Sequence, residues 1–316
     1  MKIGSVEIQS PFFLAPLAGF SDKSFREICK EYAGLMCTEM ISTKALYFND
    51  KKSFEMLDKC EGAKEQVQLF GNEPEVFYNV IKEHINKTDF DIIDINLGCP
   101  APKIVKNKMG SYLIKEPKVV GEIVRACKAA TDKPVTIKVR KSFEEIDSTF
   151  AVEEALNAGV DAVCVHGRRR EDFYTGRSDA DYIKKIGELI DVPLIANGDA
   201  VSFESAMELM KYTGAEFVSI GRGAIGNPFI FEELYKKYFN LPYEEPTDRE
   251  RIEKAIEHLN LICEIKGERV GVMEMRKQFP GYLKAMKDNK AVRNKINALN
   301  KREEVVSELK RLLRES

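Results

Sequence analysis

Eight short apolar segments recur along the first two-thirds of the chain. They begin at residues 12, 34, 67, 90, 135, 162, 193 and 217, and most of them run into a glycine. Apolar runs of roughly four to eight residues that end at turn-forming residues are typical of buried β-strands. The pattern therefore predicts eight strands.

Segments with helical spacing of apolar residues lie between most of these strands. They cover residues 73–85, 117–130, 150–159 and 202–214, and the last two end at glycine, as helices commonly do. Alternating strands and helices predict an α/β fold with a parallel sheet. Because the strands number eight and no GxGxxG motif follows the first, we expect a (β/α)8 TIM barrel and not an open doubly wound sheet.

The pattern changes after the eighth strand. Residues 240–248, NLPYEEPTD, carry two prolines and several acidic residues, as linkers do. Amphipathic helical patterns then continue to Ser316 with almost no strand signal. We expect a TIM barrel over residues 1–240, followed by a small all-helical domain over residues 247–316.

Composition narrows the class of protein. The 316 residues are 44% hydrophobic and 32% charged, which is ordinary for a globular protein. No apolar run reaches the roughly 18 residues needed to cross a bilayer, and the N-terminus has no signal-peptide pattern, so we expect a cytoplasmic protein without a membrane segment. The seven cysteines form no CxxC pair and no zinc-like cluster, so we expect reduced thiols and no metal site.

Charge is distributed unevenly. The chain has a formal net charge of −2, yet residues 269–314 hold 13 Lys and Arg against 5 Asp and Glu. A basic tail on an acidic body indicates a polyanionic partner such as nucleic acid, although a solvated helical face would give the same count.

A cysteine stands where the fourth predicted strand must stop. The apolar run of DIIDINLGCP, residues 91–100, breaks off at Gly98, Cys99 and Pro100. Residues just past the C-terminal end of a barrel strand are where such enzymes keep their chemistry, which makes Cys99 a reactive candidate. The alternative is a small buried hydrophobic residue in a turn.

The other strand ends are also polar or rich in glycine. Since the C-terminal ends of all barrel strands converge on one face, these residues should be neighbours. The set consists of Pro16, Leu17, Ala18, Glu39, Gln68, Asn96, Cys99, Lys138, Arg140, His166, Asn197, Gly198, Asp199, Gly221, Arg222 and Gly223.

Two of these strand ends indicate a phosphate site. The sequences NGD at 197–199 and GRG at 221–223 let backbone N–H groups approach an anion, and Arg222 adds a charged fork. Tight turns would explain the glycines as well.

Four more strand-end side chains are polar within apolar surroundings. Lys138 lies in an apolar run, so if it is buried it requires an anionic or polar partner; the alternative is a solvated strand end. Gln68 and His166 could hydrogen-bond a planar heterocycle, although a lone histidine is often a satisfied core residue. Glu39 could pair with a lysine or be structural.

Seven motifs, in order, carry a family resemblance. APLAGFSDKSFR from 15, QLFG from 68, NLGCPAPKIVKNKMGSYLIKEP from 96, TIKVR from 136, VHGRRREDFYTG from 165, NGD from 197 and GRGAIGNP from 221 closely resemble the tRNA-dihydrouridine synthases. The tail also resembles that family's helical domain, in EMRKQFPGYLKAM from 274 and KAVRNKINALNKREEVVSELKRLL from 290.

The resemblance implies an FMN enzyme that reduces the C5–C6 double bond of particular tRNA uridines, with NADPH or NADH as electron donor. It assigns cofactor binding to residues 1–240 and tRNA binding to residues 247–316, and implies no further protein partner, so we expect a monomer. The cofactor-binding residues implied are Pro16, Leu17, Ala18, Gln68, Lys138, His166, Asn197, Gly198, Asp199, Gly221 and Arg222.

On the substrate side the resemblance implies that Cys99 donates a proton to C5 after hydride reaches C6. A thiol of pKa about 8.5 is mostly protonated near neutral pH, as an acid must be. Asn96, Lys103, Arg168 and Tyr174 would contact the nucleotide, which must leave its stack to enter a barrel. Phosphate contacts are expected from Arg276, Lys277, Lys284, Lys287, Arg293 and Lys295.

The chain departs from the family pattern at three positions, with Gln278 in place of a histidine and Gly281 and Ala180 in place of tryptophans. The target uridine therefore stays open. Two alternatives also stay open: an FMN-dependent dehydrogenase of a free pyrimidine, of the dihydroorotate or dihydropyrimidine type, and a non-catalytic RNA-binding barrel. A basic tail would be of no use to the former.

Overall fold

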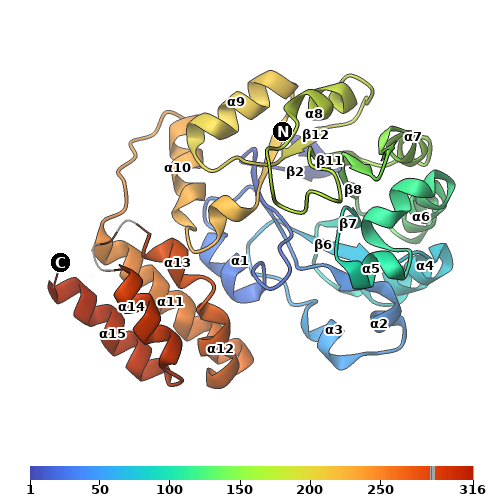
Figure 1. Cartoon of the computed structure of the whole chain (residues 1–316). Coiled ribbons are helices and arrows are strands. Elements are labelled where there is room, and N and C mark those ends of the chain that lie inside the picture. The colour runs from blue at the N-terminus through green and yellow to red at the C-terminus, as the bar shows by residue number, and fades with distance from the viewer. Residues whose placement is uncertain (285, 287–288, 316) are drawn as a thin grey trace.

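The computed structural model describes residues 1–284, 286 and 289–315. Within them, eight parallel strands form a closed barrel, because β4 pairs with both β3 and β6 while β3 also pairs with β13 (Figure 1). The eight are β3 (Phe12–Leu14), β4 (Leu35–Cys37), β6 (Glu65–Phe70), β7 (Ile92–Leu97), β8 (Val135–Arg140), β11 (Ala162–His166), β12 (Leu194–Asn197) and β13 (Phe217–Ile220). They coincide with the eight apolar segments, which confirms the predicted TIM barrel.

Helices surround the barrel (Figure 1). They are α1 (Lys23–Cys29), α4 (Pro74–Glu83), α6 (Pro117–Ala130), α7 (Thr149–Asn157), α8 (Ala180–Gly187), α9 (Phe203–Thr213) and α10 (Phe229–Tyr238). The four helices expected from periodicity correspond to α4, α6, α7 and α9. Helix α9 ends at Gly214, whose φ of 72° is the left-handed conformation that glycine adopts without strain.

Short elements occupy the connections. On the side of the strand C-termini these are β5 (Ile41–Ser42), α2 (Thr43–Tyr47), α3 (Lys51–Glu55), α5 (Pro102–Lys106) and the 3-10 turns η2 (Gly110–Lys115) and η3 (Arg222–Ala224). The hairpin β9–β10 (Ser142–Phe143 with Ile146–Asp147), which follows β8, also lies on that side. The remaining elements are η1 (Ile85–Lys87) and the N-terminal hairpin β1–β2 (Lys2–Ile3 with Val6–Glu7).

The N-terminal hairpin closes one end of the barrel. Ile3, from β1, belongs to a buried cluster with side chains from the first halves of the strands, including Phe13 and Phe217, whose rings stack 4.7 Å apart. The barrel is thus filled with apolar side chains at the N-terminal ends of its strands, which leaves the C-terminal ends for a site.

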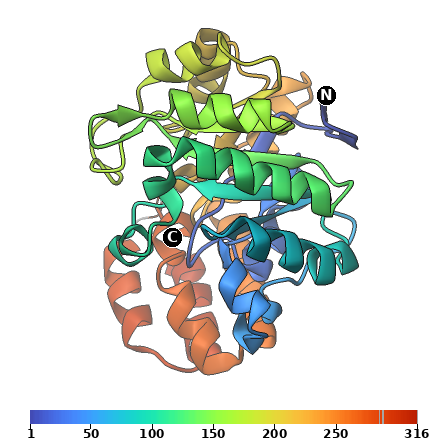
Figure 2. The ribbon, with the colours of Figure 1, turned by 90° about the vertical axis from the view of Figure 1, so that its right-hand side faces the viewer.

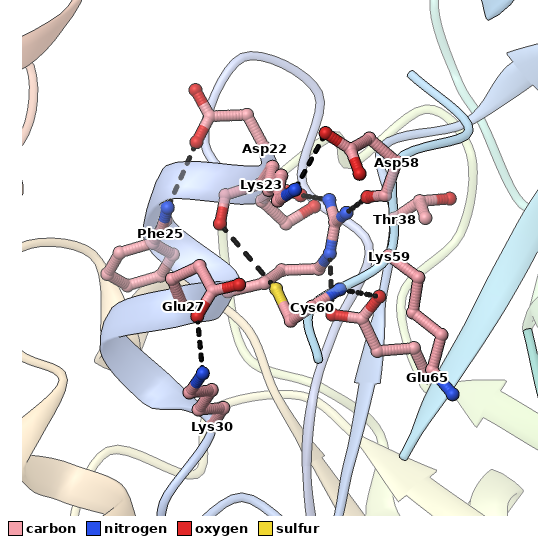
Figure 3. Close-up of polar contacts among 12 residues, drawn as sticks. Asp22, Lys23, Phe25, Glu27, Lys30, Thr38, Asp58, Lys59, Cys60 and Glu65 are labelled. Carbon is pink, nitrogen blue, oxygen red and sulfur yellow. Dashed lines mark hydrogen bonds and ion pairs between the residues drawn. The ribbon is translucent and has the colours of Figure 1, made fainter. Parts of the chain in front are cut away.

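A buried ion pair ties α1 to the barrel wall. The Nε of Arg26 donates to Oε1 of Glu65 at 2.9 Å, with both side chains at most 2% exposed. The guanidinium also donates to the carbonyl oxygens of Ser21 and Asp58, while Glu65 accepts from the backbone N–H of Cys60, as Figure 3 shows for Cys60 and Glu65. The pair therefore has hydrogen bonds on both sides, as buried charges require.

The rest of the chain is a helical bundle beside the barrel (Figures 1 and 2). It contains α11 (Asp248–Lys266), α12 (Glu268–Met275), α13 (Phe279–Tyr282), α14 (Asn289–Ala298) and α15 (Arg302–Glu315). Thr247 caps α11 in a reciprocal pair of hydrogen bonds with Glu250. The bundle has its own apolar cluster, which includes Leu259, Ile296 and Leu309.

The bundle packs directly on α1. His258 of α11 stacks on Phe25 with ring centres 5.4 Å apart, and its ring nitrogens lie 3.3 Å from Oγ of Ser24 and 3.1 Å from Oη of Tyr282. Nearby, Lys266 forms ion pairs with Asp22 of the barrel and Glu274 of the bundle. Buried contacts thus hold the bundle against the barrel.

None of the helices in the described part of the chain combines the length and the apolar character needed to cross a membrane.

Candidate active site

A cavity of about 680 Å³ lies at the C-terminal ends of the barrel strands. This volume is within the range of about 300–1,000 Å³ that is usual for small-molecule sites. All of the predicted cofactor-binding residues line it, together with Cys99, Asn96, Arg168 and Tyr174. The predicted residues Glu39, Lys103, Arg276, Lys277, Arg293 and Lys295 do not line it. The helical bundle adds Arg251, Gly281 and Lys284 to the wall.

The Cys99 loop is held by hydrogen bonds on both sides. Oδ1 of Asn96 accepts from the backbone N–H of Cys99 at 2.9 Å, while Ser111 donates through its hydroxyl to the carbonyl oxygen of Cys99 at 2.8 Å. The thiol is half-buried at the cavity, and burial raises its pKa despite the nearby Arg140 guanidinium. The sulfur therefore stays protonated at neutral pH.

A chain of buried amides leads from Cys99 into the barrel. Nδ2 of Asn96 donates to Oε1 of Gln68, and Nε2 of Gln68 donates to Asp94, both at 2.7 Å. Burial raises the pKa of Asp94, although Gln68 and Thr136 donate hydrogen bonds to its carboxylate. These bonds fix which way both amides point, so each presents a defined atom to the cavity.

Lys138 has the polar partner that its burial requires. Its Nζ donates to Oδ1 of Asn197 at 2.8 Å, and Nδ2 of Asn197 donates to the carbonyl oxygen of Ser219. No carboxylate is paired with Lys138 among the described residues. Lys138 lines the cavity, and its charge acts on the buried carboxyl of Asp94 by lowering the pKa of that group.

His166 is neutral in this environment. Burial, followed by the charges of Lys138 and Arg140, lowers the pKa of His166 well below its ordinary value. Its Nε2 lies 3.2 Å from Nη1 of Arg168. Arginine can only donate, so Nε2 accepts and the proton sits on Nδ1.

Arg168 is buried, and its guanidinium donates hydrogen bonds to other residues of the chain. It forms a two-pronged pair with Asp199 at 2.7 and 2.8 Å and donates to the carbonyl oxygens of Thr175 and Gly176. Burial raises the pKa of Asp199, but the Ser178 backbone N–H and Arg168 outweigh it, so the carboxylate has a lowered pKa. Arg168 thus holds the loop over the cavity in place.

The loop between β11 and α8, residues 167–179, places the ring of Tyr174 between two cations. The ring centre of Tyr174 lies 5.5 Å from the guanidinium carbons of both Arg140 and Arg222. Arg140 also joins this loop to the cysteine loop, because it donates to the carbonyl oxygens of Gly98 and Phe173. Such an arrangement suits a base or an anion at the mouth of the cavity.

The turns after β12 and β13 bring backbone to the cavity. Gly198 has a φ of 133°, and a Cβ there would lie 2.5 Å from Cβ of Ser178. Asp199 follows with a φ of 57°. Gly221 and Gly223 line the same region, next to the half-exposed Arg222. These features fit the phosphate site that the sequence predicted.

Other predicted residues lie outside the cavity. Lys103 is exposed on α5. Arg276 donates to the carbonyl oxygen of Leu299, and Lys277 lies 5.2 Å from the ring centre of Phe20. Of the further tail candidates, Lys284 lines the cavity, Arg293 donates to a backbone carbonyl, Lys295 pairs with Glu308 at 2.7 Å, and Lys287 lies outside the described residues.

Glu39 accepts a hydrogen bond from the backbone N–H of Gly19, and no described lysine lies within ion-pair distance of it. The sequence left open whether Glu39 pairs with a lysine or has a structural role, and this geometry favours the structural role. Met40, one residue further, lines the cavity instead, with its sulfur 3.7 Å from Nδ2 of Asn96.

Sequence reasoning did not select Met40, Arg140 or Arg251 as binding residues. For Arg140 a signal was present, since it ends β8 two residues after Lys138 and so points to the same side of the strand. For Arg251 the sequence carried no such signal, because only the packing of the bundle brings this residue to the cavity.

Known proteins resemble this chain over almost its full length. Residues 13–316 match the family model described as dihydrouridine synthase. The chain is 35% identical over 306 residues to tRNA-dihydrouridine synthase B of Vibrio parahaemolyticus, covering 95% of this chain and 94% of that one. It is 34% identical over 309 residues to a probable tRNA-dihydrouridine synthase of Rickettsia conorii, covering 95% and 92%.

Among solved structures, the old yellow enzyme homologue of Zymomonas mobilis has a TM-score of 0.51 at 13% identity, covering 78% of this chain and 93% of that one, which is a likeness of fold alone. The family match and the sequence relatives agree with each other and with the motifs that line the cavity. The chain therefore belongs to the dihydrouridine synthase family.

Proposed function

We propose that this protein uses FMN to reduce the C5–C6 double bond of specific uridines in tRNA. The observation that carries the proposal is the Cys99 thiol, which burial keeps protonated at a cavity that also holds Lys138 and two glycine turns. Membership of the family supports both the reaction and the substrate class.

The residues of the cavity fit a flavin mononucleotide. Its phosphate would lie against the backbone at Gly198 and Gly221, with Arg222, and its ribityl chain near His166, Asn197 and Asp199. Pro16, Leu17 and Ala18 would contact the ring system, and Gln68 and Lys138 would hydrogen-bond its polar edge. When bound and reduced, this cofactor supplies the hydride for C6 of the uracil.

Cys99 then has one defined task. Negative charge develops at C5 of the pyrimidine once C6 has received hydride, and the thiol proton neutralises it. Asn96 holds the backbone of the cysteine loop, and Ser111 holds its other side. Lys138 places positive charge in the same cavity, where it stabilises anionic character at the polar edge of the cofactor.

The substrate would be bound by both parts of the chain. A target uridine must leave its stack to enter the cavity, at a cost of a few kcal/mol. Asn96, Arg140 and Tyr174 would contact the extruded nucleotide, and Arg168 would keep the loop of Tyr174 in place. Lys103, Arg276, Lys277 and Lys284 would contact RNA around it. We thus assign cofactor binding to residues 1–240 and RNA binding to residues 247–316, with NADPH or NADH as electron donor.

Substitution of the acid tests the proposal. In Cys99→Ala, anaerobic NADPH should still bleach the flavin absorbance, because no thiol is needed for that half-reaction. Dihydrouridine formation in unmodified tRNA, measured by mass spectrometry of digested nucleosides, should fall by about 100-fold or more. Wild-type turnover by the variant would overturn the role of Cys99. Wild-type enzyme that reduced free pyrimidines but not uridines in tRNA would overturn the function.

A further inference from the structure

The loop after η3 of the barrel lies against the start of α13 in the bundle. The backbone N–H of Gly226 donates to the side-chain Oε1 of Gln278 at 2.7 Å in a buried position. Gln278 itself is 3% exposed. The residue that departs from the family's histidine thus serves as an acceptor between the two parts of the chain.

Backbone touches backbone at the same place. A Cβ on Gly281 would overlap the carbonyl oxygen of Ile225 and lie 2.8 Å from Cα of Gly226. A Cβ on Gly226 would overlap the carbonyl oxygen of Gln278 and lie 2.9 Å from Cα of Gly281, and the φ of Gly226 is 61°. Real Cβ atoms do not approach within 3.0 Å of such neighbours, so this contact requires glycine on both sides.

The contact borders the cavity. Ile225 and Asn227 line it from the barrel side, and Gly281 and Lys284 line it from the bundle side. Arg251, also from the bundle, lines it too. The interface between barrel and bundle is therefore one wall of the site.

We infer that Gln278 and Gly281 are positioning residues, which hold the bundle as a fixed wall of the active site. This inference rests on the proposed function. Both residues act through the wall and not by contact with reacting atoms. A shift of about 1 Å in such a wall can lower the rate of the chemical step about 100-fold, because the reacting groups lose their alignment.

A fixed wall and a simple RNA-binding appendage have different kinetic consequences. If the bundle contributed affinity alone, disturbing its contact with the barrel would raise KM for tRNA and leave kcat unchanged. If the wall aligns the uridine with Cys99 and the cofactor, kcat falls even at saturating tRNA.

The test compares Gly281→Ala and Gln278→Met with two controls. Alanine at 281 forces the backbones apart, and methionine at 278 keeps the side-chain length but leaves the Gly226 N–H without its acceptor. Gln278→Glu retains an acceptor oxygen, and Pro280→Ala alters an exposed neighbour of Gly281. Each variant is measured for FMN content, circular dichroism, flavin reduction by NADPH, and kcat and KM on unmodified tRNA.

We expect kcat on tRNA to fall about 10- to 100-fold in Gly281→Ala, and less in Gln278→Met, with unchanged FMN content and flavin reduction. Gln278→Glu should retain more of kcat than Gln278→Met, because it keeps the acceptor oxygen although it buries a carboxyl group. Pro280→Ala should match wild type. A rise in KM alone, or loss of flavin or folded structure in both variants, would overturn the inference. Wild-type enzyme assayed in parallel tests the proposed function separately, since it must form dihydrouridine whatever the variants do.

Discussion

Burial in the barrel alters the pKa values of single side chains at the candidate active site. Cys99, His166 and Asp94 all have pKa values displaced by burial toward the neutral form. Lys138 is bound instead by the amide of Asn197 and keeps its positive charge for the cavity. The cavity thus contains both a neutral acid and a cation, which suits proton donation to a developing carbanion.

The pH dependence of the reaction should report Cys99. Donation requires the protonated thiol, and burial raises the pKa of Cys99, so the alkaline limb of kcat should lie above the value of about 8.5 for a free thiol. We expect constant kcat from neutral pH to beyond that value, then a decline as the thiolate forms. Stopped-flow measurement of uridine reduction across pH 7–10 gives this pH dependence, and flavin reduction over the same range is the control. A decline of kcat that began below pH 8 would contradict the conclusion that burial raises the pKa of Cys99.

Between elements, buried polar contacts fix how helices meet strands. The ion pair of Arg26 and Glu65 joins α1 to β6, and the same α1 receives α11 of the bundle. By contrast, the pair of Lys23 and Asp58, 2.7 Å apart, is partly exposed to water, with the two side chains 28% and 56% exposed. The two cations lie on one helix, so the pairs offer a matched comparison of buried and partly exposed charge.

Arg26→Met should lower the free energy of unfolding by about 3–5 kcal/mol, because it leaves the Glu65 carboxylate buried without its partner. The double variant Arg26→Met, Glu65→Leu should recover part of this loss. Lys23→Ala should change the free energy by about 1 kcal/mol or less. Urea unfolding followed by circular dichroism measures all three. Equal effects of Arg26→Met and Lys23→Ala would show that burial of the pair is unimportant.

Across the whole molecule, stability depends on the junction of barrel and bundle. Burial lowers the pKa of His258 to about 4, and the ring lies among Ser24, Phe25 and Tyr282 from both parts. The folded protein therefore keeps this histidine neutral, whereas the unfolded chain binds a proton near pH 6.5. Between these values the unfolded state binds more protons, so stability falls as the pH drops.

The free energy of unfolding should fall by about 3 kcal/mol more in wild type than in His258→Gln between pH 7 and pH 4. Glutamine removes the titrating group while retaining hydrogen-bonding capacity toward Ser24 and Tyr282. Urea unfolding at both pH values measures the difference. If wild type and variant lost stability equally, His258 would not be the group that links folding to pH.

Local pattern was sufficient for the eight strands, four of the helices between them and most of the residues that line the cavity. Strand ends such as Gln68, Asn96 and Lys138 were predictable as neighbours, because closure of a parallel barrel brings all C-terminal strand ends to one face. The family resemblance added roles for these residues. At Glu39 the local pattern was not sufficient. The neighbouring Met40 lines the cavity instead, and no periodicity in that short segment distinguishes the two residues.

The contacts between barrel and bundle did not follow from the chain order. Gly226 with Gln278, Phe25 with His258, and Arg251 at the cavity are all pairings of distant segments. Periodicity and turn residues specify each element because those preferences act within a few residues. The docking of one finished unit on another depends on shape and buried hydrogen bonds across the whole surface, which exist only once both units have folded.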